Sequence, residues 1–152
     1  PTAKWVAGAH AGWRGLAGQN GHGVVETLAQ AANAADLQTR DCLVWLGPCI
    51  GPTAFEVGQD VYDAFAEQLP LANSATGLFV PTLNGKYMAD LAGLARRRLK
   101  LAGFQNLYGN DSTQPWCTYK QSEKYHSHRR DAALLGSAGR MAAYIWITSL
   151  TS

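Results

Sequence analysis

Two kinds of apolar pattern alternate along the chain. Uninterrupted apolar runs at residues 5–9, 42–46 and 141–147 predict buried strands, because each is short and is bounded by polar or glycine-rich segments. Shorter runs at residues 106–108 and 116–119 flank a turn and predict two more strands. Apolar residues at helical spacing predict helices over residues 24–32, 60–68 and 87–102. The pattern as a whole therefore predicts one α/β or α+β unit.

The stretch over residues 87–102 has the strongest helical pattern. Six apolar positions fall on one face of that helix: Met88, Leu91, Leu94, Ala95, Leu99 and Ala102. Gly103 is a natural stop, and the arginines at 96–98 are expected at the exposed end of the helix. Residues 11–23 read as a glycine-rich loop, and residues 71–85 as a polar connection with one short apolar stretch at 78–80.

Composition narrows the class of protein. Of 152 residues, 47% are hydrophobic, which excludes a disordered chain. The net charge of +2 argues against a nucleic-acid partner, and the apolar runs are all too short to span a membrane. Three cysteines form an odd, sparse set, which favours a reducing cytoplasm over a disulfide scaffold. The chain opens on Pro1 without a methionine, so processing, or excision from a longer protein, is expected.

His10 is the first candidate for chemistry. It follows a predicted strand and precedes a glycine-bracketed turn, a position where a strand fixes the side chain and the turn leaves space before it. A metal ligand or a catalytic base would suit that position. A purely structural histidine fits it as well, so both interpretations stay open.

The second candidate is the polar segment at residues 125–131. If it is extended, His126 and His128 point to one face, as two ligands of one metal could. Arg129 and Arg130 then point to opposite faces, and an arginine beside a polar pocket suits phosphate. The alternative is a solvated edge strand whose arginines pair with Asp131.

Cys49 is the third candidate, in a rigid loop between two Gly-Pro pairs. It has no basic neighbour in sequence to lower its pKa, which favours a small buried residue over a thiolate. Phosphate-binding loops, dinucleotide fingerprints and paired metal-ligand motifs are missing from the sequence. The residues alone therefore support an α/β domain with a histidine-centred site.

Three motifs in order resemble those of a known family. They are His10 to Leu16 (HAGWRGL), Leu46 to Pro52 (LGPCIGP) with Phe55 to Gly58 (FEVG), and Ser127 to Asp131 (SHRRD) followed by Gly139-Arg140. The chain is similar to the YfiH-like family of laccase-domain proteins over about residues 3–148. The resemblance implies a layered mixed β-sheet with flanking helices. It also implies that residues 1–152 form a single, partial laccase domain lacking the N-terminal segment of its relatives.

The resemblance also implies a metal site. Family members hold their metal with two histidines and a cysteine, and His10 matches one of these ligands. The other two would lie upstream of this chain, and Cys49 does not match the metal cysteine. A catalytic zinc site usually has three protein ligands, so His10 alone would not hold zinc tightly. His126 and His128 stand where the family usually has aromatic residues.

The activity implied is that of a zinc-dependent purine nucleoside phosphorylase acting on adenosine, inosine and methylthioadenosine, with an adenosine deaminase side activity. His10 would be the catalytic metal ligand. Arg129 or Arg130 would contact the anion, with Arg14 behind them. The expected partners are a nucleoside and phosphate, without nucleic acid or membrane. The alternatives are a copper-dependent polyphenol oxidase, a peptidoglycan-precursor editing hydrolase, and a non-catalytic domain with an incomplete metal site.

Overall fold

The computed structural model describes residues 5–66 and 77–148. Five α-helices and five short strands lie in this part of the chain, and the strands form two separate small sheets. The α/β class is therefore confirmed. The helices within these described residues are all too short or too polar to cross a membrane.

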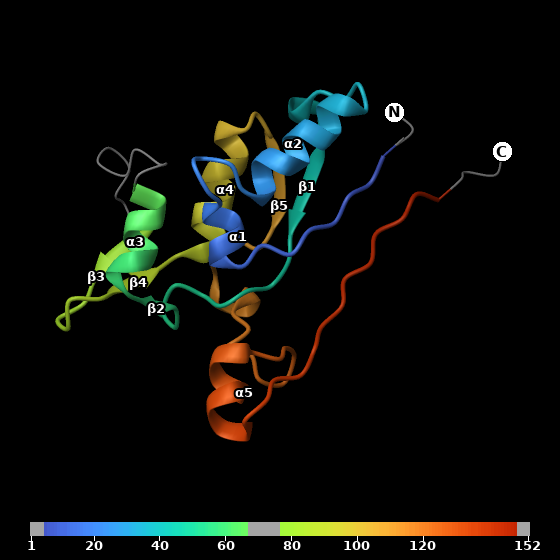
Figure 1. Cartoon of the computed structure of the whole chain (residues 1–152). Helices are drawn as coiled ribbons and strands as arrows, with labels where there is room; N and C mark the ends of the chain where they lie inside the picture. Colours follow the sequence, from blue (N-terminus) through green and yellow to red (C-terminus); the bar gives the residue numbers. More distant parts are fainter. Residues whose placement is uncertain (1–4, 67–76, 149–152) are drawn as a thin grey trace.

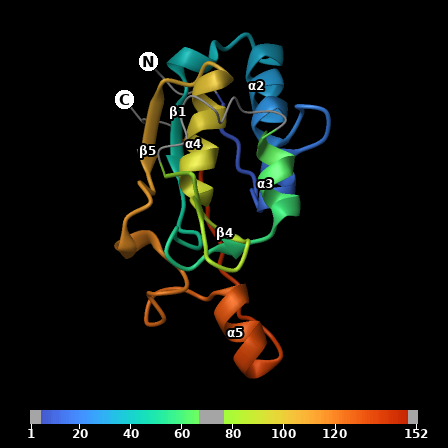
Figure 2. The same ribbon diagram turned by 90° about the vertical axis from the view of Figure 1, so that its left-hand side faces the viewer.

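The first sheet is a parallel pair, β1 (Leu43–Leu46) beside β5 (Asn106–Gly109). Helices α1 (Trp13–Ala17), α2 (Val24–Ala34) and α4 (Leu91–Leu101) pack with this pair (Figures 1 and 2). Val44, Leu46 and Leu107 face the common core with them. The alternate residues Leu43, Trp45 and Tyr108 are 76%, 59% and 55% exposed. Among residues 5–66 and 77–148, helices therefore cover only one face of a sheet type that is normally covered on both.

The second sheet is antiparallel, with β4 (Tyr87–Ala89) between β2 (Glu56–Val57) and β3 (Phe79–Pro81). Helix α3 (Gln59–Ala66) packs on it. Tyr62 of this helix stacks on Tyr87 with ring centroids 4.6 Å apart and meets Phe79 edge-on at 5.2 Å. This aromatic cluster joins the helix to both neighbouring strands.

Glycines permit the close approach of α1 and α2. Gly18 has φ of 69°, and a Cβ there would overlap the backbone of His22. A Cβ on Gly23 would lie 2.7 Å from the carbonyl oxygen of Gly15. The sequence between 11 and 23, expected to be a loop, instead folds as a short helix and a tight turn, because these positions carry no side chain.

The region predicted as one helix over 87–102 divides at Asp90. Residues 87–89 pair as β4, and the carboxylate of Asp90 accepts the backbone N–H of Gly93 at 2.8 Å, which begins α4. The expectation that all three arginines at 96–98 lie at an exposed end is wrong, because Arg98 is only 3% exposed. The short apolar stretch at 78–80 contributes β3. Residues 67–68 of the helix predicted over 60–68 lie outside the described residues, as do residues 71–76.

Two predicted buried strands do not form. Residues 5–9 and 141–147 have no strand partner among the described residues and run outward on the side where β1 lies (Figure 1). Tyr144 and Trp146 are 83% and 71% exposed. The predicted strand at 116–119 is also wrong, because a 3-10 turn, η3 (Gln114–Trp116), and an isolated bridge at Cys117 occupy that region. A strand needs a neighbour to pair with, which the apolar pattern alone does not supply.

Candidate functional site

His10 lies in an exposed segment just before α1. Its side chain makes no hydrogen bond or ion pair within the described part of the chain. The ring lies near Gly12, where a Cβ would be 3.4 Å from His10 Nε2. The histidine is therefore free to bind a ligand, and the structural role considered from the sequence has no contact to support it.

Arg14 lies on α1, four residues after His10. It is exposed, and its guanidinium carbon lies 4.4 Å from the centroid of the Trp13 ring. This cation–π contact leaves the N–H groups of Arg14 without an acceptor among residues 5–66 and 77–148. Arg14 can therefore donate to an anion without breaking an existing bond.

The segment that contains His126 and His128 is not extended. Ser127 caps helix α5 (His128–Leu135), because its Oγ accepts the backbone N–H of Arg130 at 3.4 Å. Asp131 Oδ2 accepts the backbone N–H of Ser127 at 2.8 Å. The prediction that His126 and His128 share the face of a strand is wrong, because this capping pattern starts a helix between them.

Arg130 is held by the chain itself. Its Nε and Nη2 donate to the two carboxylate oxygens of Asp131 at 2.6 and 3.1 Å. Its Nη1 donates to the carbonyl oxygens of Thr118 and Tyr119, and Nη2 also donates to that of Tyr125. The guanidinium has only five N–H groups, and five acceptors surround it. The predicted pairing of an arginine with Asp131 is therefore present. The bonds from Arg130 to the three carbonyl oxygens tie α5 to the preceding loop.

Arg129 differs from Arg130 in its freedom. One nitrogen, Nη1, donates to the carbonyl oxygen of Glu56 at 3.0 Å, and the guanidinium lies 5.6 Å from the centroid of Phe55. Its other N–H groups have no acceptor in the described residues, and the side chain is exposed. Of the two neighbouring arginines, Arg129 is the one that can still grip an oxyanion.

The acid that neutralises Arg130 is itself perturbed. Backbone donation from Ser127, followed by the bond from Arg130, holds the pKa of Asp131 below its usual value. His126 Nδ1 lies 4.0 Å from Asp131 Oδ2, and this histidine is 58% exposed. The four residues expected to form the site, His10, Arg14, Arg129 and Arg130, are not joined to one another by any hydrogen bond in the part of the chain the structure describes.

A metal would find too few ligands here. The described residues contain no group of three or more His, Cys, Asp or Glu side chains arranged to hold an ion. His10 therefore stands as a single imidazole, which does not fit a catalytic zinc or copper site without further ligands.

Cys49 takes the structural role expected of it. Burial raises the pKa of its thiol to about 11, although the amide of Asn110, which donates to Sγ at 3.3 Å, acts in the opposite direction. Its backbone pairs with the second loop, because Cys49 N donates to Trp116 O and Thr118 N donates to Cys49 O. A thiol with so high a pKa is a poor nucleophile near neutral pH.

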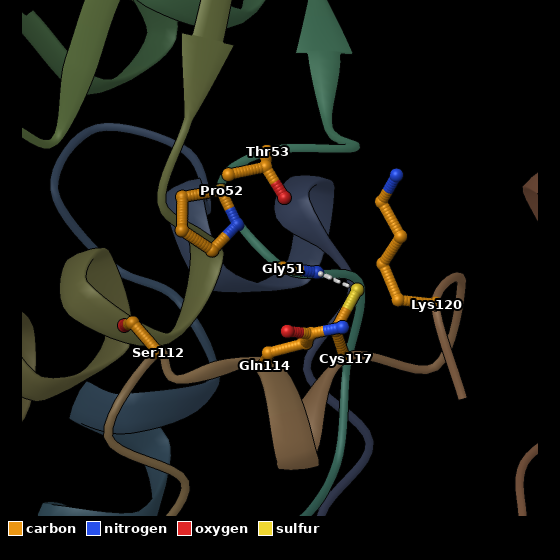
Figure 3. Close-up of a pocket in the computed structure, with 7 residues that line it drawn as sticks. All are labelled: Gly51, Pro52, Thr53, Ser112, Gln114, Cys117 and Lys120. Atoms are coloured by element: carbon orange, nitrogen blue, oxygen red, sulfur yellow. Dashed lines mark hydrogen bonds between the residues drawn. The ribbon is translucent and has the colours of Figure 1, made fainter.

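Sequence reasoning missed one further site. The loops that follow β1 and β5 line a pocket of about 340 Å³ (Figure 3). Its lining residues are Gly51, Pro52, Thr53, Ser112, Gln114, Cys117 and Lys120. The sequence signal for this pocket was that each of the two loops follows a predicted strand, at residues 42–46 and 106–108. That signal becomes informative once the two strands are known to be parallel neighbours.

Comparison with known proteins shows which family the chain is similar to. The family model for multi-copper polyphenol oxidoreductase laccase matches residues 1–148. Purine nucleoside phosphorylase YfiH of Escherichia coli K12 is 42% identical over 142 residues, which is 93% of this chain and 51% of that protein. A purine nucleoside phosphorylase of Pseudomonas aeruginosa is 41% identical, with 93% of this chain and 52% of that protein covered. The chain thus spans about half the length of these relatives.

Solved structures agree with this match. A Neisseria meningitidis protein is 41% identical, with a TM-score of 0.66 over 82% of this chain and 46% of that chain. YlmD of Geobacillus stearothermophilus is 32% identical, with a TM-score of 0.68 over 81% of this chain and 43% of that one. With the family model covering nearly all of its length, the chain belongs to the multi-copper polyphenol oxidoreductase laccase family, to which the sequence motifs pointed.

Proposed function

We propose that this chain is one part of a metal-dependent purine nucleoside phosphorylase. The observation that carries the proposal is the relatives' shared description as purine nucleoside phosphorylases, at 38–42% identity across at least 91% of the chain in four bacterial species. The substrates would be phosphate and a nucleoside such as adenosine, inosine or methylthioadenosine, and adenosine deamination would be a side activity.

In phosphorolysis an oxygen of phosphate forms a bond to the anomeric carbon of the sugar while the bond from that carbon to the base nitrogen breaks. The base leaves with the electron pair and takes up a proton, so cations that hold phosphate lower the barrier. Arg129 and Arg14 have N–H groups available for this role. The donors of Arg130 are engaged with Asp131 and three carbonyl oxygens, so Arg130 is expected to hold α5, which also carries Arg129, against the preceding loop.

His10 would be a metal ligand in the complete site. The metal would be zinc, and its role would be that of a Lewis acid or a source of activated water for the side activity. Because His10 stands alone among the described residues, the remaining ligands would have to come from the N-terminal part that the family resemblance implies. This chain by itself is then expected to be inactive.

A second function is copper-dependent oxidation of phenols, favoured by the description of the family whose model matches. A non-catalytic domain with an incomplete metal site is the third candidate, favoured by the single free imidazole of His10. A hydrolase that edits peptidoglycan precursors would use the same metal site at His10. These candidates differ in what they consume, namely phosphate, oxygen, water or nothing.

The test is chromatography of the products formed from adenosine and phosphate in the presence of zinc. Three proteins are compared: this chain, a chimaera that adds the N-terminal part of the Escherichia coli relative, and the chimaera carrying His10→Ala. We expect free base and ribose 1-phosphate only from the unmodified chimaera. His22→Ala is the matched control, because the His22 side chain is also exposed and its hydrogen bond in the described residues is to Thr27 Oγ1 at 3.3 Å.

Activity of this chain alone would contradict the incomplete site. An inert chimaera that has bound zinc would overturn the phosphorylase proposal. Oxygen uptake with a phenol, dependent on copper and not on phosphate, would then establish the oxidase.

A further inference from the structure

The pocket in Figure 3 lies where two parallel strands end. β1 ends at Leu46 and β5 at Gly109, which are paired in register, and the two loops that follow supply all the lining residues. Backbone bonds between the loops hold them together, with Thr118 N donating to Cys49 O at 2.8 Å. In open α/β sheets, ligands bind in the crevice beyond the carboxyl ends of such strands. The position is therefore one where a ligand is expected.

One lining residue is held in a strained conformation. Ser112 has φ of 72°, a left-handed value that residues other than glycine rarely adopt. Asn110, only 2% exposed, accepts the backbone N–H of Ser112 at 2.9 Å, and its amide donates to Gly47 O at 3.1 Å. The strain persists because this buried amide fixes the turn. Residues that a rigid surrounding structure holds in a strained conformation are found most often at binding sites.

The Ser112 hydroxyl is oriented as well. It donates to Asp90 Oδ1 at 2.6 Å, and that carboxylate also accepts the N–H of Gly93 at the start of α4. Since its proton is committed to Asp90, the Ser112 oxygen can present only lone pairs to a ligand. It is therefore suited to accept a hydrogen bond from a ligand hydroxyl.

Lys120 brings a positive charge to the lining, while the Asp90 carboxylate stands behind Ser112. Lys120 is the only charged side chain of the lining, and it forms no ion pair with any carboxylate in the described residues. Figure 3 shows Lys120 and Thr53 on opposite sides of the opening above Gly51. The exposed side chains of Thr53 and Gln114 supply further hydrogen-bond donors among the lining residues. An ammonium with neutral donors around it matches an oxyanion with several acceptor oxygens.

We propose that this pocket binds a phosphate group, either as inorganic phosphate or as the ester of a small sugar. Lys120 neutralises the charge, Thr53 and Gln114 donate to the oxygens, and Ser112 accepts from a sugar hydroxyl when one is present. The proposal rests on the proposed function, since phosphorolysis consumes phosphate and forms a sugar phosphate. Neither Arg129 nor Arg14 lines this pocket, so it is a phosphate position in addition to the one expected of those arginines.

The test is isothermal titration of this chain with inorganic phosphate, ribose 1-phosphate and, as a neutral arm, ribose. Near-UV circular dichroism of its tryptophans checks that each variant keeps its packing. Lys120→Gln is expected to weaken binding of both phosphate compounds about tenfold, because it removes a charge-assisted hydrogen bond. Lys124→Gln, which changes an exposed lysine outside the lining, should change the affinity less than twofold.

Ser112→Gly separates the two sources of phosphate, because it relieves the left-handed strain while removing the hydroxyl. Tighter binding of ribose 1-phosphate than of inorganic phosphate, with the difference lost in Ser112→Gly, would identify a sugar phosphate as the ligand. Equal binding of both, unchanged by Ser112→Gly, would identify free phosphate. Absence of saturable binding, or equal losses in Lys120→Gln and Lys124→Gln, would overturn the proposal.

The binding measurements do not depend on whether the protein catalyses phosphorolysis. If the chimaera catalyses phosphorolysis but Lys120→Gln does not change the phosphate affinity, the proposed function is supported and the proposed phosphate pocket is wrong. Binding that depends on Lys120, together with an inert chimaera, would do the reverse.

Discussion

The guanidinium of Arg98 lies 2.7 Å from Glu26 Oε2 and joins α4 to the first turn of α2. Arg98 is 3% exposed, and it also donates to the carbonyl oxygens of Ala17 and Gly21 at 3.0 and 3.2 Å. The same Glu26 oxygen accepts the N–H of Gly23. This ion pair thus fixes the turn between α1 and α2. Of these two helices, α1 is the one that follows His10.

Replacing Arg98 with methionine is expected to destabilise the chain by about 3 kcal/mol, because a partly buried carboxylate and two carbonyl oxygens lose their donor. Urea unfolding monitored by far-UV circular dichroism measures this change. Lys100→Met is the matched control, since Lys100 is exposed on the same helix. Equal effects of the two substitutions would show that the pair contributes nothing beyond the general cost of losing a charge.

The carboxylate of Asp131 should govern part of the acid sensitivity of the fold. Its pKa is lowered in the folded chain, first by the backbone N–H of Ser127 and then by Arg130. Its stabilising contribution is therefore fully present above the ordinary aspartate pKa of about 3.9 and is lost as pH falls from there through the folded value.

Asp131→Asn is thus expected to lower stability at pH 7, and its deficit relative to the native chain should shrink as pH falls from about 5 towards 2. Thermal unfolding across that pH range gives the comparison. Asp63→Asn, an exposed carboxylate that accepts a bond from Gln59, is the control. A constant deficit at every pH would contradict the linkage.

The open face of the parallel pair should cause self-association. Leu43, Trp45 and Tyr108 expose apolar surface on one side of a two-stranded sheet, and such faces and edges invite further pairing. Leu43→Thr combined with Tyr108→Thr should reduce association severalfold in sedimentation velocity while costing at most about 1 kcal/mol, since threonine favours strands.

Val44→Thr provides the opposite case on the inner face. Val44 packs against the core, so this change should lower stability and leave association unimproved. Unchanged association in the Leu43 and Tyr108 variant would show that another surface is responsible.

The Cys49 thiol should resist alkylation. Burial raises its pKa from 9.0 to about 11, so at pH 8 its thiolate fraction is about 100-fold below that of an ordinary thiol. Iodoacetamide labelling followed by peptide mass mapping should modify Cys42 first. The rate at Cys49 should rise about tenfold per pH unit between 8 and 10, because the pKa lies above that range. Fast labelling of Cys49 at pH 8 would contradict its structural role.

The sequence marked His10 and the segment at 127–131 as candidate positions for chemistry. It did not predict the local structure of that segment, which was expected to be extended and instead begins α5. The roles of the two arginines could not be predicted, because their acceptors are distant in sequence. Arg130 donates to Thr118 and Tyr119 in a preceding loop. Arg129 donates to the carbonyl oxygen of Glu56 on β2. The phosphate pocket was equally hidden, since Lys120 and Thr53 approach each other only when their loops follow paired strands.

The sequence by itself determined the α/β class, the family, the α2 helix and the β1 and β5 strands, because these depend on local periodicity and on motifs within single segments. Only the tertiary structure decided which apolar segments pair as strands and which of their side chains face the core. Residues 141–147 read as strongly as 42–46, yet only the latter run finds a parallel neighbour and a layer of helices. Strand formation and burial require a partner for each backbone group and each apolar face, and that partner is a property of the whole fold.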